Sequence, residues 1–87
     1  MVEVEDVMGR YLVETSAIDD ATTRRARHVA ARRYPEVVIE ASFGTHEGPT
    51  THGVWICHAP SDHHVRQWAA AAQLDIHRLT SIIHLAP

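Results

Sequence analysis

The order of hydrophobic patterns along the chain constrains its fold more than any single residue does. Four short segments are rich in β-branched and aromatic residues or alternate between apolar and polar side chains, which is typical of strands. They are Arg10 to Thr15, Val37 to Thr45, His52 to Ala59 and Leu79 to Leu85. Two further segments, one on either side of the central pair of strands, have apolar residues at the helical spacing.

Both helical segments also carry start signals. Asp19 and Asp20 are capping residues for a helix that reaches Arg33, and Ser61 is the cap of a helix whose apolar stripe is Val65, Trp68, Ala69 and Ala72. The order is therefore β-α-β-β-α-β. This order predicts the ferredoxin-like α+β fold, an antiparallel sheet that carries both helices on one face and leaves the other face open.

The length of 87 residues leaves room for a single hydrophobic core. We expect a flexible N-terminal leader at 1–8 and one domain at 9–87. A domain of this size is marginally stable by itself, and the open sheet face would expose apolar residues such as Val38 and Trp55 or their register partners. We therefore predict a homodimer.

The two central strands predict a hairpin whose loop is Glu47-Gly48-Pro49-Thr50. In that register His46 faces Thr51, Ser42 faces Trp55, and Glu40 faces Cys57. Strict alternation would then put Ile39, Ala41 and Phe43 on one face together with Val54, Ile56 and His58.

Composition excludes several classes of protein. Cys57 is the only cysteine, so an intramolecular disulfide is impossible and the cytoplasm is the expected location. No apolar stretch is long enough to cross a membrane. The formal net charge of −3 argues against nucleic acid as a partner.

Basic side chains gather on the first predicted helix, which carries five arginines and one histidine. They form a surface that could hold a phosphate or an acidic partner, although a solvated helix face is the usual explanation. These residues are Arg24, Arg25, Arg27, His28, Arg32 and Arg33.

Histidine is the most over-represented residue type, with eight copies in the chain. Neutral imidazole and thiolate are ligands that suit nickel, zinc and copper, so we predict a divalent transition-metal site. Two of the histidines flank the predicted hairpin turn, and one near the C-terminus could complete a site between subunits. The candidate ligands are His46, His52, Cys57, His58 and His84.

The chain lacks the nucleophile-elbow, phosphate-loop and dinucleotide-binding signatures of common enzymes. The alternative to a metal-binding protein is a dimeric α+β barrel that binds a small ligand or acts as a cofactor-free enzyme at the open sheet face. His58 or His84 would then be the base.

The segment Trp55-Ile-Cys-His-Ala-Pro-Ser-Asp-His-His-Val-Arg-Gln-Trp, continued by Leu74-Asp-Ile-His-Arg-Leu-Thr-Ser-Ile, resembles a family of small actinobacterial ferredoxin-like proteins. Arg10 to Glu14 is similar to the first strand of that family. Some members are nickel-binding or nickel-responsive. The resemblance implies the same fold and favours nickel as the metal, whereas His58 and Leu74-Asp75 depart from the family pattern.

Overall fold

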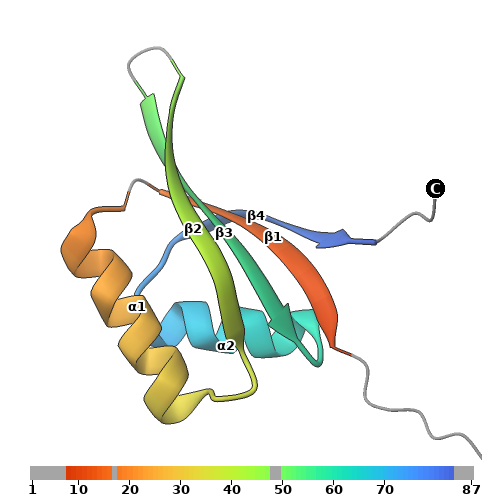
Figure 1. The fold of residues 1–87 in the computed structure, drawn as a ribbon. Helices are drawn as coiled ribbons and strands as arrows, with labels where there is room; N and C mark the ends of the chain where they lie inside the picture. The colour runs from red at the N-terminus through yellow and green to blue at the C-terminus, as the bar shows by residue number, and fades with distance from the viewer. Residues whose placement is uncertain (1–7, 17, 48–49, 84–87) are drawn as a thin grey trace, which may run out of the picture.

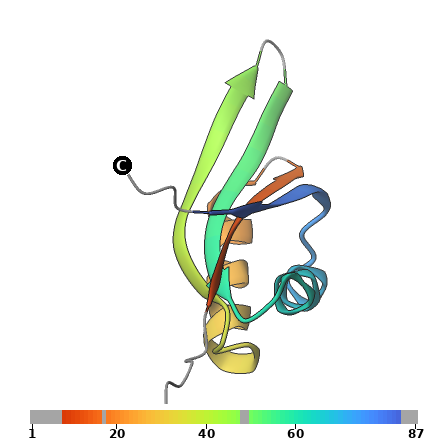
Figure 2. The same ribbon diagram turned by 90° about the vertical axis from the view of Figure 1, so that its right-hand side faces the viewer.

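A four-stranded antiparallel sheet is covered on one face by two helices (Figure 1). The computed structural model describes residues 8–16, 18–47 and 50–83. In chain order the elements are β1 (Gly9–Ser16), α1 (Asp20–Arg33), β2 (Val38–Glu47), β3 (Thr50–Ala59), α2 (Asp62–Ala71) and β4 (Ile76–Ile82). The strands lie in the order β2-β3-β1-β4, and Figure 2 shows both helices on the same side of the sheet. The predicted ferredoxin-like α+β fold is therefore confirmed.

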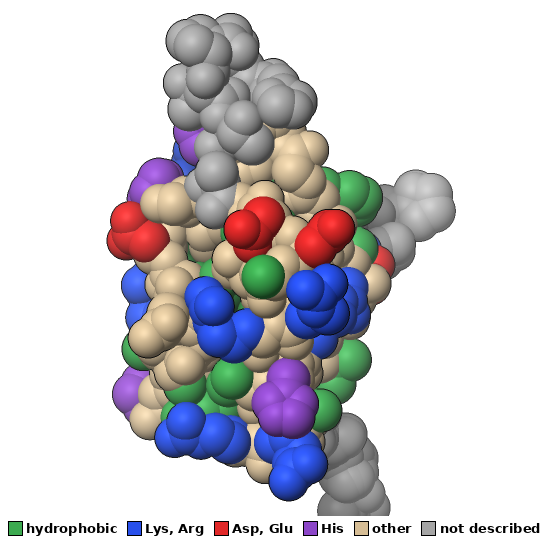
Figure 3. Space-filling view, turned by 90° about the vertical axis from the view of Figure 1, so that its left-hand side faces the viewer, with side chains coloured by type: hydrophobic (Ala, Val, Ile, Leu, Met, Phe, Trp, Pro, Cys, Tyr) green, Lys and Arg blue, Asp and Glu red, His purple; other side chains and the backbone are tan. Residues whose placement is uncertain are grey.

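Helix α1 begins where the sequence predicts. The Asp19 carboxylate accepts a hydrogen bond of 2.8 Å from the Thr22 amide, which satisfies one of the free donors of the first turn. The small residues Ala26 and Ala30 are buried against the sheet. Basic side chains gather over the outer face of the helix (Figure 3), so α1 is amphipathic.

Helix α2 begins at the predicted cap, Ser61, and buries Val65, Trp68 and Ala69. After it, Gln73 adopts a positive φ of 62°. This left-handed conformation ends the helix, and the following amide, that of Leu74, donates to the Ala69 carbonyl at 2.8 Å.

Two tryptophans occupy the centre of the core. Trp55 from β3 and Trp68 from α2 are both fully buried, and their rings meet edge to face with centroids 5.5 Å apart. The prediction that Trp55 lies on the open face is wrong. Its neighbours in β3 alternate regularly, so Trp55 points with Cys57 towards the helices.

Strand β2 departs from the predicted alternation because it contains a β-bulge. His46 faces Thr51 and Ser42 faces Trp55 as predicted, but Ile39, not Glu40, faces Cys57. The register shifts between Ile39 and Ala41, which makes Glu40 the extra residue. The shift puts Ile39 against the core, whereas Ala41 and Phe43 lie on the open face.

The last strand also differs from the prediction. It begins at Ile76 instead of Leu79 and ends at Ile82. Pairing with β1 decides these bounds, because Thr15 faces Ile76 and Val13 faces Leu79 in the core layer. Residues 1–7 of the predicted leader lie outside the described residues.

Candidate functional site on the open sheet face

The face of the sheet that the helices leave uncovered has an apolar centre. Alternation along β1 and β3 places Leu12, Val54 and Ile56 there, each half-buried. The edge strand β2 adds Val38 and Phe43, whose exposed fractions are 50% and 51%. Polar side chains occupy the two ends of this face and form two separate clusters.

The first cluster joins β1, β2 and β3 around the bulge. Glu40 accepts two hydrogen bonds from the Arg10 guanidinium, at 3.0 and 2.9 Å, and its carboxylate lies 2.8 Å from His58 Nε2. The hydrogen bonds from Arg10, and to a smaller extent the one with His58, hold the pKa of Glu40 below its ordinary value. Both oxygens of Glu40 and one nitrogen of His58 are thus engaged within the protein.

The second cluster lies at the opposite end of β1 and β3. Ser16 Oγ donates to Asp75 Oδ2 at 3.1 Å and lies 3.1 Å from His77 Nε2. A serine hydroxyl has one proton, so His77 Nε2 is the donor in the second contact and its other ring nitrogen carries the lone pair. The ring of His52 meets that of His77 edge to face, with centroids 6.3 Å apart.

The strand order explains why these side chains meet. Strand β1 lies between β3 and β4, and its residue Ser16 faces His52 on one side. On the other side the Ser16 amide donates to the Asp75 carbonyl at 3.1 Å. A register shift leaves His77 between the pairs made by Ile76 and Arg78, which turns this histidine towards Ser16.

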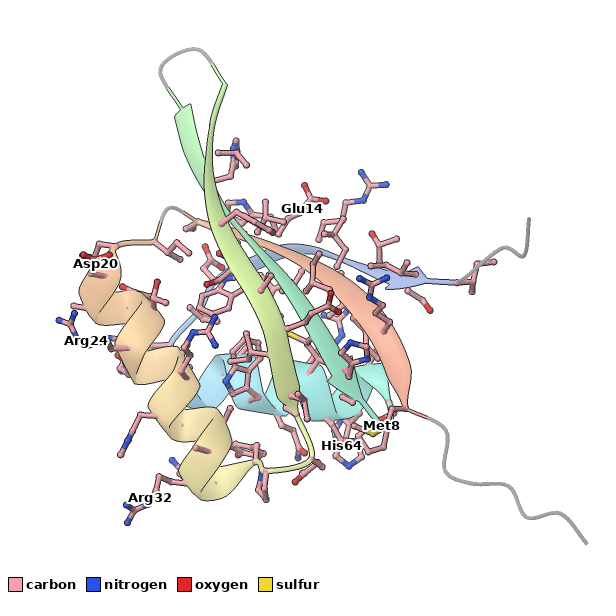
Figure 4. All side chains as sticks on the ribbon, in the orientation of Figure 1. Met8, Glu14, Asp20, Arg24, Arg32 and His64 are labelled. Atoms are coloured by element: carbon pink, nitrogen blue, oxygen red, sulfur yellow. The ribbon has the colours of Figure 1, made fainter. Side chains whose placement is uncertain are left out.

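A hollow of about 350 Å³ adjoins the second cluster on the open face. Its apolar lining comes from Leu12 and Val54, and its polar lining from Glu14, Thr45 and His52. Figure 4 labels Glu14, which projects from β1. His52 therefore belongs both to the hollow and to the histidine pair.

Of the predicted metal ligands, the three whose side chains the structure describes, His52, Cys57 and His58, do not come together. Cys57 is fully buried in the core, where burial raises the pKa of its thiol to about 12. His52 and His58 share a face of β3 but lie about 20 Å apart along it. His46 is paired with Thr51 in the hairpin, and its side chain is outside the described part. His84 also lies outside the described residues.

Within residues 8–16, 18–47 and 50–83, no three histidine, cysteine, aspartate or glutamate side chains are arranged to hold one metal ion. The fold instead brings His52 beside His77, a residue that the sequence did not single out. The pattern Asp75-Ile-His77 at the start of a strand was the available signal. Its meaning depends on the position of β4 beside β1, which only the structure supplies.

Comparison of the chain with family models, curated proteins and solved structures finds no match. The resemblance to nickel-binding proteins therefore stays a prediction. No helix among the described residues is long and apolar enough to cross a membrane.

Proposed function

We propose that the protein binds a divalent transition metal ion through His52 and His77 on the open sheet face. The observation that supports this most is the 6.3 Å separation of the two rings. Two imidazoles on one tetrahedral ion, with metal–nitrogen bonds of about 2.0–2.1 Å, have centroids about 5 Å apart. Both side chains are partly exposed, so a small rotation closes the difference.

Ser16 and Asp75 also support metal binding, because both contact the ring of His77 and would orient it. Metal-binding histidines commonly donate their second ring N–H to an oxygen of the protein, which fixes the ring and its tautomer. His77 Nε2 has the Ser16 hydroxyl at 3.1 Å and the Asp75 carboxylate at 3.5 Å. Two imidazoles leave coordination positions for water, a small ligand or a second copy of the chain. We propose nickel as the metal because of the family resemblance.

Calorimetric titration of untagged, metal-stripped protein with nickel and with zinc tests this function. We expect a dissociation constant below about 0.1 mM. His52→Ala and His77→Ala should each weaken binding at least tenfold. The matched control is His28→Ala, an exposed histidine on α1. Absence of binding, or equal losses in all three variants, would contradict the proposal.

We propose further that two copies associate through their open sheet faces. The support is the exposure of Val38 and Phe43 next to the half-buried Leu12, Val54 and Ile56 on one continuous face. Sedimentation equilibrium at micromolar concentration should give a dimer, and Phe43→Glu should give a monomer. Ala70→Glu, which adds the same charge at an exposed position of α2, is the control.

Small-molecule binding is a second candidate function, supported by the hollow that adjoins the histidine pair. The combination of Leu12 and Val54 with Glu14, Thr45 and His52 joins an apolar lining to a few polar groups. A thermal-shift screen of small acids and aromatic compounds beside the metals would separate the two functions. A compound that uses the hollow should lose its effect in Val54→Phe, whereas this variant keeps both histidines.

A further inference from the structure

A groove of about 290 Å³ lies between α1 and the edge strand β2, away from the histidine pair. Apolar residues line most of it: Ala30, Ala31, Pro35, Val37, Val38 and Ile39. Arg27 completes the lining. It precedes Ala30 and Ala31 by one helical turn, and its guanidinium reaches the Ser42 hydroxyl on β2 at 3.4 Å. The groove thus has an apolar floor and a cationic end.

The charge of this region differs from that of the whole molecule. Helix α1 contains five arginines and one aspartate, so its formal charge is five minus one, or +4. The chain as a whole carries −3. Among the described residues, no carboxylate lies within ion-pair distance of Arg27. Its guanidinium therefore has hydrogen-bond donors left for an external anion.

The shape of the groove favours a small molecule over an added β-strand. Strand β2 is at the edge of the sheet, where an extended peptide could pair with it. The bulge at Glu40 directly follows the groove residues Val38 and Ile39, and a bulge disrupts the regular ladder that strand addition needs. A volume near 290 Å³ is that of about ten water molecules in the liquid, which suits a small ligand.

We propose that this groove binds a small aliphatic carboxylic acid. The carboxylate accepts hydrogen bonds from the Arg27 guanidinium, which matches it in a bidentate geometry. The hydrocarbon chain lies on Ala31 and Pro35, both of which are exposed in the unliganded protein. Apolar burial and charge recognition come from adjacent parts of the same groove, so neither an amide nor an inorganic anion should replace the acid.

Two-dimensional amide NMR during titration with 4-methylpentanoate tests the proposal on the intact chain. We expect saturable shifts at the amides of Ala30, Ala31, Val37 and Ile39. The corresponding amide, 4-methylpentanamide, should bind at least tenfold more weakly, since it lacks the charge. Inorganic phosphate in its place tests for simple anion attraction to α1 and should give no saturable shifts at the groove.

Arg27→Gln should weaken binding of the acid at least tenfold. The matched control, Arg24→Gln, removes the same charge from α1 at a side chain that points away from the sheet (Figure 4). Ala31→Met should also weaken binding because its side chain fills the groove. Equal affinity for acid and amide, equal losses in both arginine variants, or shifts confined to the open sheet face would overturn the proposal. A protein that fails to bind nickel can still bind the acid, because the groove does not include His52 or His77.

Discussion

The two core tryptophans differ in a single hydrogen bond. Trp68 Nε1 donates to the Ala26 carbonyl at 2.9 Å, whereas Trp55 Nε1, also buried, has no partner among the described residues. Trp68→Phe should therefore lower the free energy of unfolding by about 1–2 kcal/mol more than Trp55→Phe does. Urea denaturation followed by circular dichroism measures both. Equal losses would mean that Trp55 Nε1 has a partner, such as a buried water.

A second comparison at the scale of single residues uses two glycines that face each other across β2 and β3. A Cβ atom at Gly53 would lie 2.5 Å from Thr15 Oγ1 and 3.0 Å from the Ser16 carbonyl, whereas at Gly44 it would meet nothing within 4 Å. We expect Gly53→Ala to destabilise the protein by about 1–3 kcal/mol. Gly44→Ala should change stability by less than about 1 kcal/mol. The same denaturation measurement distinguishes the sites, and a similar loss at both would contradict the packing argument.

At the scale of elements, the residue that ends α2, Gln73, adopts a left-handed backbone conformation that glutamine tolerates poorly. Gln73 has φ 62°, a region that costs a residue with a Cβ about 1–2 kcal/mol relative to glycine. Gln73→Gly should therefore raise the melting temperature. Gln67→Gly, at an exposed position inside the same helix, should lower it because glycine is a poor helix former. Changes of the same sign in the two variants would refute this explanation.

The stability of the fold depends on pH through Glu40, the extra residue of the bulge in β2. Glu40 has a lowered pKa in the folded protein because Arg10, and then His58, hydrogen-bond to its charged form. The stability that this group contributes is fully present above the unfolded pKa of glutamate, about 4.3, and is lost as the pH falls through the folded value. Melting temperatures of Glu40→Gln should therefore fall less steeply in acid than those of the parent protein. Glu36→Gln is the charge-matched control and should keep the parent slope.

At the scale of the whole molecule, Cys57 reports on the packing of the helices against the sheet. Its thiol is fully buried and has a pKa of about 12, so reaction requires the helix layer to open. At pH 8, modification by a disulfide reagent should be at least about 1000-fold slower in the native protein than in guanidinium, given a stability near 5 kcal/mol. An added exposed cysteine in the variant Ser81→Cys should react at once. Comparable rates at the two sites would show that the core is loosely packed.

The sequence by itself determined the order of the elements and both helix starts. Helical periodicity and capping are local properties, so Asp19, Ser61 and the stripe of Val65 and Trp68 were sufficient to place α1 and α2. The β-α-β-β-α-β order then restricted the fold to the ferredoxin-like α+β arrangement, which the sheet confirms.

Only the tertiary structure decided which side chains share the open face. A strand of period two reverses its faces when a single residue is inserted, and the bulge at Glu40 does this within β2. The meeting of His52 with His77 depends likewise on β1, which lies between two strands far apart in sequence. Register between distant strands is set by packing of the whole sheet on its helices, so no local pattern could have predicted that pair.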